Sequence, residues 1–459
     1  MGNVIVVTHW LDGDVVPYIR IAKELKRRGH NVKLITHCYF ENMAKMAGLE
    51  FQAWDTPEEY AELVDLMETN KSDHAFQSKK FSYSLNEFRQ KTENLDIRLK
   101  EYKIVDECCQ SPDTVFLCKS RSSVAAYLVA EKKKLPLATV IGYPSEVASM
   151  LLYDELEGKN DIGRLNELRR TLDLEPVDSW LQWESSAKMT MVLWPDWYDD
   201  SYVQWPTNIE AVGFPLEQGK EAFHREIPED FSNWLEKNPN PILITGGTTK
   251  LIDKEFYTSS IEACRILGQP TILLCKYEEF VPKVLPSNVV WYKYIPLDEI
   301  MPKISVLIHH GGIGTVTGGL AAGTPQMILA SYTDRPYNAT LIKELGAGDY
   351  LLPGNWQPEK IAEKITALQD KSFVENCKKY ILKMKENRGI TVAADRVEQM
   401  MNNDEYIYSI NRDFGKQGKA NTVISCSSKD IESKEKEQSV IDKQRAMLLL
   451  KQKIRKNSN

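Results

Sequence analysis

The chain has 459 residues, of which 42% are hydrophobic and 27% charged, and its formal net charge is −7. This length exceeds the usual limit for a single hydrophobic core and predicts two domains with an appendage. The negative balance argues against a nucleic-acid-binding surface spread over the whole protein. No apolar run is long enough to cross a bilayer, and the N-terminus lacks the pattern of an export signal.

The cysteines are scattered along the chain without C-x-x-C pairs or histidine partners at metal-binding spacing. Such a distribution is typical of reduced, mostly buried thiols. We therefore expect a cytoplasmic protein and no metal site.

The chain opens with a β-α-β pattern. An apolar strand at residues 4–8 leads into a helix from Val15 to Arg28, which ends at Gly29, and a second strand follows at residues 32–36. This order predicts a parallel sheet in an α/β domain, which we place at residues 1–215.

A helical, aromatic stretch follows between residues 54 and 106. Its aromatic residues are irregularly spaced rather than alternating as in a strand: Trp54, Phe76, Phe81, Tyr83 and Phe88. They are suited to wall an apolar binding site. Ordinary core or lid packing explains them equally well.

A polar linker at residues 216–238 separates the first domain from a second domain at residues 239–403. Five short apolar strands alternate there with helical segments: residues 242–245, 271–274, 289–292, 306–309 and 326–330. This alternation predicts a doubly wound sheet, in which ligands bind beyond the carboxyl ends of the strands.

One of those strand ends carries a glycine-rich turn with the sequence HHGGIGT, residues 309–315. A helix N-terminus at this point binds phosphate through free N–H groups and the positive end of the helix dipole. Gly312 and Gly314 allow close backbone approach, while Thr315 adds a hydroxyl and His310 an imidazole. The alternative is a turn used only for packing.

The chain changes character again in residues 404–459. Residues 416–438 are too polar to bury a core and predict a disordered spacer, whereas residues 440–455 have the pattern of a basic amphipathic helix. Docking to a biosynthetic partner, attachment to a membrane surface and a solvated tail all remain open.

Several segments together resemble the family 1 glycosyltransferases, in their bacterial natural-product and sterol branch. They are HHGGIGT, GGLAAGTPQMILA (318–330), DRPYNATLIKELGAG (334–348), GDVVPYIRIAKELKRRGHNVKLIT (13–36) and VLWPDWYDDSYVQWPTNIEAVGFP (192–215). The resemblance implies the GT-B fold, with two facing Rossmann-like domains, parallel sheets and here a flexible C-terminal tail. The first domain would bind the acceptor and the second the nucleotide sugar.

The resemblance assigns the role of general base to Asp14, which would take the proton of an acceptor hydroxyl. An ordinary helix N-cap is the alternative reading of this residue. His9 is a weaker candidate for the base. We expect the acceptor to contact His9, Gly13, Trp54 and Phe81.

The donor site is predicted to extend beyond the glycine-rich turn. Its residues would be Thr248, Tyr294, Ile295, His310, Gly312, Gly314, Thr315, Asp334 and Arg335. Thr248 would reach the diphosphate, and Tyr294 would support the heterocyclic base of the nucleotide. Asp334 would accept hydrogen bonds from the hydroxyls of the sugar. Relatives often have Gln where this chain has Arg335. This difference puts glucose in doubt as the transferred sugar and makes an acidic sugar or a deoxysugar an alternative. Arg335 facing a neighbouring carboxylate or the phosphate is the other reading.

Together these features predict an inverting, metal-independent glycosyltransferase that uses a UDP- or dTDP-linked sugar and no further cofactor. Its acceptor would be a lipophilic small molecule such as a polyketide or peptide natural product. The alternative is a catalytically silent GT-B protein that activates a partner enzyme, for which loss of Asp14 or His310 would be the signature.

Overall fold

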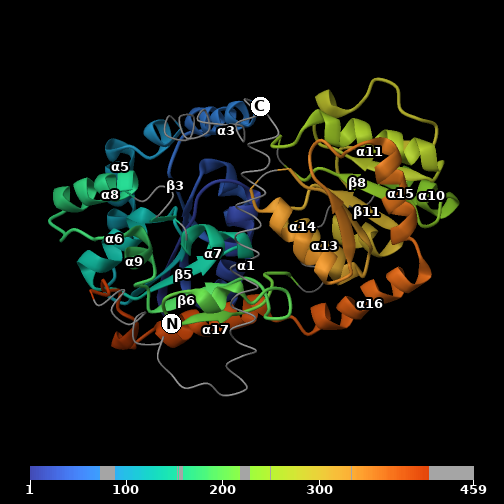
Figure 1. The fold of residues 1–459 in the computed structure, drawn as a ribbon. Coiled ribbons are helices and arrows are strands. Elements are labelled where there is room, and N and C mark those ends of the chain that lie inside the picture. The colour runs from blue at the N-terminus through green and yellow to red at the C-terminus, as the bar shows by residue number, and fades with distance from the viewer. Residues whose placement is uncertain are drawn as a thin grey trace, which may run out of the picture.

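The computed structural model describes residues 1–72, 88–151, 153–154, 159–217, 228–248, 250–331 and 333–412. They form two α/β halves that lie side by side (Figure 1). The first half contains strands β1 (Asn3–Val7), β2 (Asn31–Thr36), β3 (Glu50–Ala53), β4 (Thr114–Lys119), β5 (Leu137–Ile141), β6 (Met189–Val192) and β7 (Ile209–Ala211). Its helices are α1 (Asp12–Arg27), α2 (Glu41–Met46), α3 (Pro57–Ser72), α5 (Leu95–Cys108), α6 (Val124–Lys133), α7 (Pro144–Leu151), α8 (Lys159–Thr171) and α9 (Trp180–Glu184), with short 3-10 turns η1 (Cys38–Phe40) and η3 (Ser201–Gln204).

The second half has the same plan. Its strands are β8 (Ile242–Thr245), β9 (Thr271–Leu274), β10 (Val289–Tyr292), β11 (Val306–His309), β12 (Gln326–Leu329) and β13 (Gly348–Leu351). Its helices are α10 (Glu229–Lys237), α11 (Lys254–Leu267), α12 (Leu297–Ile300), α13 (Ile313–Ala322), α14 (Arg335–Glu344), α15 (Pro358–Leu368) and α16 (Lys371–Lys385), with 3-10 turns η4 (Glu278–Phe280) and η5 (Met301–Lys303).

Both sheets are parallel and doubly wound. Their strand orders are β3-β2-β1-β4-β5-β6-β7 and β10-β9-β8-β11-β12-β13. The central strands β4 and β5 are buried along their whole length, as expected where helices cover both faces of a parallel sheet. The predicted α/β class is confirmed, and the five strands predicted in the second half are present.

Each sheet has one point at which the strand order reverses. In the first sheet this switch point lies between β1 and β4, and in the second between β8 and β11. Parallel doubly wound sheets bind ligands in the crevice outside the carboxyl ends of strands at such points. Figure 1 shows α1 and α7 of the first half on the side that faces α13 and α14 of the second.

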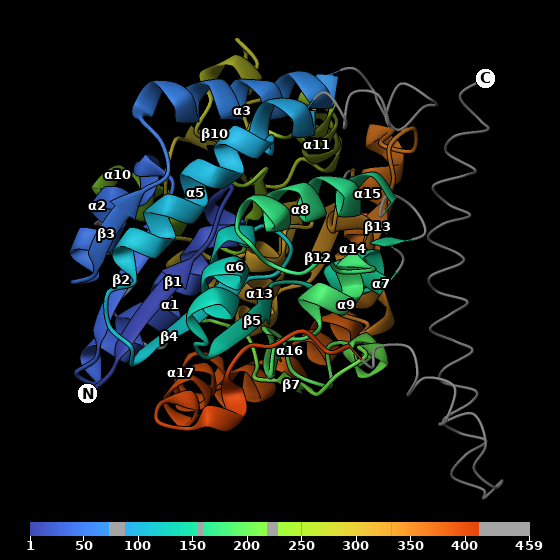
Figure 2. The same ribbon diagram turned by 90° about the vertical axis from the view of Figure 1, so that its left-hand side faces the viewer.

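The chain returns to the first half at its end. After α16 the side chain of Asn387 exchanges two hydrogen bonds of 2.7 Å with the backbone of Phe214. A Cβ at Gly389 would lie 2.3 Å from the carbonyl oxygen of Phe214, so only glycine fits this close crossing. Helix α17 (Gly389–Met400) then packs beside α1, away from the second sheet (Figures 1 and 2).

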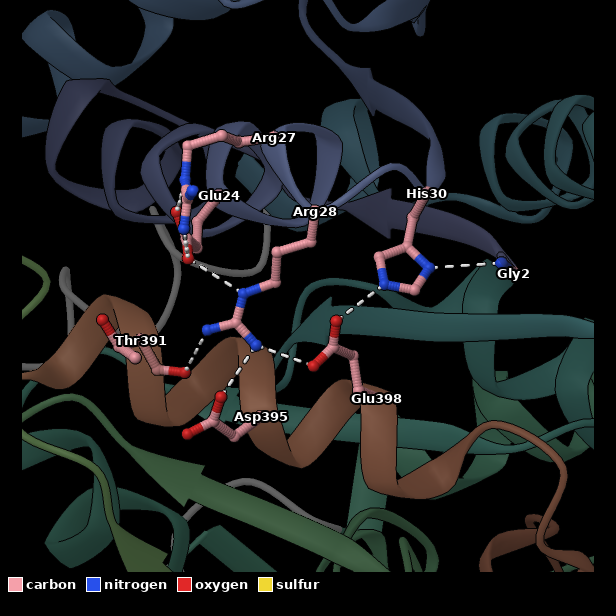
Figure 3. A network of polar contacts seen from close by, with 8 residues as sticks. All are labelled: Gly2, Glu24, Arg27, Arg28, His30, Thr391, Asp395 and Glu398. Carbon is pink, nitrogen blue, oxygen red and sulfur yellow. Dashed lines mark hydrogen bonds and ion pairs between the residues drawn. The ribbon is translucent and has the colours of Figure 1, made fainter.

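A polar network holds α17 against the first half (Figure 3). The guanidinium of Arg28 donates to Asp395 and Glu398 of α17, both at 2.7 Å. The Nε2 atom of His30 lies 2.8 Å from Glu398, while its Nδ1 accepts from the backbone N–H of Gly2 at 3.2 Å. The last helix is therefore part of the first folded half.

The packed chain continues past residue 403, where the sequence predicts that the second domain ends and the C-terminal tail begins. Tyr408 is 2% exposed, and its hydroxyl donates to the carbonyl of Trp183 at 2.6 Å. The Asn411 N–H donates to Ser186 Oγ at 2.9 Å. Residues 404–411 thus cover the first half, because they supply a buried aromatic ring and backbone partners to it. The predicted basic helix at residues 440–455 lies outside the described residues.

Among the described residues, no helix is long and apolar enough to cross a membrane.

Candidate active site

The predicted base lies at the switch point of the first sheet. Asp14 is in the first turn of α1, which follows β1, and Lys119 is the last residue of β4. The Nζ atom of Lys119 is 3.2 Å from Asp14 Oδ1. The Thr8 hydroxyl donates to the backbone carbonyl of Asp14 at 2.7 Å and fixes this turn. The strand order therefore brings a carboxylate and an ammonium together from distant parts of the sequence.

Asp14 does not cap its helix. Helix α1 begins at Asp12, the preceding residue is Leu11, and no side chain makes a capping bond. The alternative reading of Asp14 as a plain N-cap is therefore wrong. Burial raises the pKa of Asp14, Lys119 acts in the opposite direction, and Glu146 raises it further. A carboxylate whose pKa is raised toward neutrality is a better proton acceptor than an ordinary aspartate.

The glycine-rich turn lies at the switch point of the second sheet, directly after β11. The imidazole of His310 fills the space above two glycines. A Cβ at Gly247 would lie 2.7 Å from its Cε1 atom, and one at Gly312 would lie 2.5 Å from its Nε2 atom. Gly312 was expected to let a ligand approach the backbone, whereas in the structure its missing side chain makes room for this ring.

His310 is a neutral group. Burial lowers its pKa well below the ordinary histidine value, and the nearby Arg335 lowers it further. Its Nδ1 atom is buried, and a hydrogen bond with the backbone of Thr245 acts on the pKa of the ring in the opposite direction. The ring is therefore held in place between β8 and the glycine-rich turn.

Helix α13 begins within this turn, directly beyond the carboxyl end of β11. Gly312 occupies the N-cap position. Gly314 is exposed, and no atom of the described residues lies within 4 Å of the position that a Cβ would take there. Thr315 is partly exposed in the same first turn. Free N–H groups, open space at Gly314 and a hydroxyl are together the features of an anion site at a helix N-terminus.

Asp334 and Arg335 stand at the start of α14. The carboxylate of Asp334 accepts bonds of 2.8 Å from Thr333 Oγ1 and from Asn338 Nδ2. Asn338 Nδ2 also donates to the carbonyl of Gly311 at 3.0 Å, which ties α14 to the glycine-rich turn. Burial raises the pKa of Asp334, and Arg335 opposes this shift. Arg335 is 8% exposed and donates to Ser331 Oγ at 3.3 Å.

The two switch points face each other. Asp334 is close enough to Asp14 for its charge to raise the pKa of Asp14. The hydroxyl of Tyr337 in α14 donates to Asp199 of the first half at 2.9 Å. A crevice between the halves is lined by Leu11, Asp12, Tyr39, Tyr60, Val64, Met67, Thr248, Lys250, Leu251, Lys276 and Tyr277.

The remaining donor residues lie along the second half. Thr248 is exposed in this crevice, and its hydroxyl donates to Asp12 of the first half at 2.9 Å. Tyr294 is 46% exposed, so its ring is accessible, whereas Ile295 is 1% exposed and belongs to the core. The role of these two residues as a platform for the nucleotide stays a prediction.

The residues expected to contact the acceptor are divided by the structure. Gly13 is exposed in the first turn of α1. His9 and Trp54 are 4% and 5% exposed, and their rings stack with centroids 4.7 Å apart. They pack in the core instead of lining the crevice, and His9 is held there by Glu101 at 3.1 Å. Its burial lowers the pKa of the imidazole. Phe81 lies outside the described residues.

The sequence patterns did not point to Lys119 and Glu146 near Asp14, nor to Tyr39 and Tyr60 in the crevice. For Lys119 a signal exists, because a lysine at the end of the apolar run VFLCK is unusual inside a buried strand. Nothing in the sequence pairs Lys119 with Asp14, because their contact depends on which strands are neighbours.

Two family models match the chain. Residues 12–151 match the glycosyltransferase family 28 N-terminal domain, and residues 275–398 match the C-terminal domain described as erythromycin biosynthesis protein CIII-like. The two models, one in each half, make the chain similar to the GT-B glycosyltransferases.

Curated relatives agree with this family. The chain is 26% identical over 412 residues to the sterol 3-beta-glucosyltransferase UGT80A2 of Arabidopsis thaliana, covering 83% of this chain and 63% of the relative. It is 24% identical to the sterol 3-beta-glucosyltransferase of Candida albicans, covering 86% of this chain and 27% of the relative. The chain thus spans less than two thirds of the length of these relatives.

Solved structures agree on the fold. The glycotransferase of kitacinnamycin has a TM-score of 0.65 and 17% identity, covering 87% of this chain and 99% of that one. The calicheamicin glycosyltransferase CalG4 has a TM-score of 0.64 and 19% identity, with 87% and 98% coverage. The predicted GT-B fold of two Rossmann-like domains is confirmed.

Proposed function

We propose that this GT-B chain transfers a sugar from a UDP- or dTDP-linked donor to a hydroxyl of a lipophilic small molecule, with inversion at the anomeric carbon. The observation that carries the proposal is the facing arrangement of the two switch points. Asp14 lies at one, the His310 turn lies at the other, and the charge of Asp334 acts on Asp14 across the gap.

The reaction is a single displacement. The acceptor oxygen forms a bond to the anomeric carbon while its proton passes to the carboxylate of Asp14. The bond from that carbon to the diphosphate oxygen breaks, and the nucleoside diphosphate leaves with the electron pair. The free N–H groups of α13, Thr315 and His310 are placed to stabilise the charge that develops on the diphosphate. We propose that these donors act without a metal ion.

The acceptor class is a sterol or another lipophilic natural product. Two facts support this choice. The curated relatives are named as sterol glucosyltransferases, and the crevice presents apolar and aromatic side chains, among them Tyr39, Tyr60, Val64 and Met67. VinC, a glycosyltransferase solved in complex with dTDP, has a TM-score of 0.60 and 14% identity, covering 87% of this chain and 99% of that one. Its ligand is the reason to test dTDP-linked sugars beside UDP-linked ones.

We further propose a cytoplasmic location. Docking of residues 440–455 to a biosynthetic partner or to a membrane surface also stays a proposal.

The test is a transfer assay on the purified chain in EDTA. UDP-glucose, UDP-glucuronic acid and dTDP-glucose are offered with a sterol and with an aromatic polyketide, and products are detected by mass spectrometry. We expect one donor to give a glycoside, with a β linkage by NMR from these α-linked donors. Nucleotide binding without transfer to any acceptor would favour the silent scaffold protein instead.

A further inference from the structure

A lysine stands between two carboxylates beside the proposed base. The Nζ atom of Lys119 is 3.2 Å from Asp14 Oδ1 and 3.2 Å from Glu146 Oε1. The side chains of Lys119 and Glu146 are 5% and 6% exposed, and that of Asp14 is 24% exposed. Asp14 is thus the open end of a buried chain of three charged groups.

Glu146 is firmly held on the far side of the lysine. It lies in the first turn of α7, where its Oε1 accepts a short hydrogen bond from the Ser120 hydroxyl. Its Oε2 accepts from the backbone N–H of Gly142 at 3.2 Å. The ring of Tyr143 lies with its centroid 5.5 Å from the Lys119 ammonium. These contacts fix the position of the charge on Glu146.

One cation shared by two anions behaves differently from a simple ion pair. Lys119 paired with Asp14 alone would stabilise the Asp14 carboxylate and make it a poor proton acceptor. Glu146 offsets part of that stabilisation, since both oxygens lie 3.2 Å from one nitrogen and hence within about 6.4 Å of each other. When Asp14 takes a proton, Lys119 still has Glu146 as its partner, so no buried charge is left unpaired.

We infer that Glu146 is a positioning residue that shares the Lys119 ammonium with Asp14 and so keeps Asp14 effective as the base of sugar transfer. This inference rests on the proposed function, because it assigns a role to groups that touch the base and not the substrate.

Other titratable groups face Asp14 from the surrounding elements. Tyr18 of α1 and Tyr143 before α7 are both influenced by its charge, and Asp334 acts on it from the second half. The charge of Glu146 in turn raises the pKa of Glu184 of α9, and the backbone N–H of Arg121 donates to Glu184 at 2.5 Å. Among the groups that act most strongly on Asp14, Lys119 is the one that favours its charged form.

The test compares the pH dependence of kcat/KM in the wild-type protein and two variants. Glu146→Gln keeps the size of the side chain and an oxygen for Lys119, but removes the charge that competes for it. We expect the acid limb of the profile to move to lower pH by about one unit, with reduced kcat at its plateau. Lys119→Met should move the limb to higher pH, by about one unit or more.

Glu131→Gln is the matched control. It neutralises a carboxylate of the same half that pairs with Arg169 at 2.7 Å. Within the described part of the chain, Glu131 is not among the groups that contact Asp14 or shift its pKa most strongly. Its acid limb should coincide with that of the wild-type protein. Carbon-13 spectra of aspartate-labelled protein report the pKa of Asp14 without turnover. The Asp14 signal is assigned as the one that is missing in Asp14→Asn. This measurement on Glu146→Gln remains informative if Lys119→Met folds poorly.

Shifts in opposite directions for Glu146→Gln and Lys119→Met support the inference. Equal losses of activity with unmoved limbs would overturn it and leave the proposed function standing. If the wild-type protein transfers no sugar, or Asp14→Asn is fully active, the proposed function fails first. The carbon-13 titration then decides separately whether Glu146 and Lys119 act on Asp14.

Discussion

The two switch points share one architecture but use opposite chemistry. The first gathers buried charges, with Lys119 in contact with Asp14 and Glu146, and with Glu146 acting on the pKa of Glu184. The second is neutral at the glycine-rich turn itself, with the oppositely charged Asp334 and Arg335 beside it at the start of α14. Burial lowers the pKa of His310 well below neutrality, and the first turn of α13 offers N–H groups and a hydroxyl.

This difference assigns separate tasks to the halves. A proton acceptor must titrate, and the buried carboxylate of Asp14 has a raised pKa for that purpose. A site for a departing diphosphate needs fixed dipoles that are already oriented and that do not change charge with pH. We therefore expect the proton-transfer step to titrate in the first half. In the second half, burial also raises the pKa of Asp334, so this carboxylate is a group there that can titrate beside the donor site.

The largest effect should come from Asp14→Asn. Removing the base should lower kcat by about 10²- to 10⁴-fold, the usual contribution of general base catalysis. Donor affinity, measured by isothermal titration with the nucleoside diphosphate, should stay within a few-fold, because the diphosphate site lies in the other half. Turnover within a few-fold of wild type would remove Asp14 from its role.

Two truncations test how far the first half extends. Ending the chain after Arg412 should leave stability and activity near wild type. Ending it after Asn403 removes the buried ring of Tyr408 and should cost about 3 to 5 kcal/mol, the range for deleting a large core aromatic. Urea unfolding of both forms measures the difference, and equal stabilities would show that residues 404–411 contribute nothing.

Glu184 should make the first half lose stability as pH rises. Burial raises its pKa from 4.5 to about 7, so the folded state holds this proton longer than the unfolded state. The free energy of unfolding therefore begins to fall above pH 4.5, and the fall is complete above about pH 7, where it reaches about 3 kcal/mol. Glu184→Gln should abolish this loss between pH 5 and pH 8 in urea titrations; an unchanged loss would place the titrating group elsewhere.

The second half can be probed with a pair of glycines. Gly312→Ala puts a Cβ 2.5 Å from His310 Nε2 and should lower donor affinity about tenfold by displacing the ring. Gly314→Ala meets no atom of the described residues within 4 Å, so any loss there reports contact with the ligand itself. Calorimetry with both variants separates the two causes. Unchanged affinity in Gly312→Ala would exclude His310 from the donor site.

The smallest effect concerns the bond between Asp12 and Thr248, which joins the halves at 2.9 Å. A carboxylate at this place repels a diphosphate and occupies the hydroxyl expected to bind it. Asp12→Ala, which removes both the charge and the acceptor, should therefore raise donor affinity by a few-fold, since a net hydrogen bond is worth about 1 kcal/mol. Weaker binding would instead indicate that the bond holds the crevice in its binding form.

Short-range patterns predicted most of what lies within single segments. Apolar runs identified the strands of the second half, and the glycine-rich turn was predicted at the end of β11. Contacts between distant segments could not be predicted this way. Lys119 and Glu146 meet Asp14 because β4 is the neighbour of β1, and Arg28 meets Glu398 because α17 returns to α1. The role of Gly312 also depended on the position of the His310 ring.

The most direct test of the divided roles is to measure donor affinity and kcat/KM for the acceptor over the same pH range, using the nucleotide sugar that supports transfer. The account predicts an acid limb in kcat/KM, where Asp14 takes up a proton, and a flat donor affinity across that limb. A donor affinity that falls along the same limb would show that the titrating group acts on the diphosphate, and would contradict the assignment of proton transfer to the first half alone.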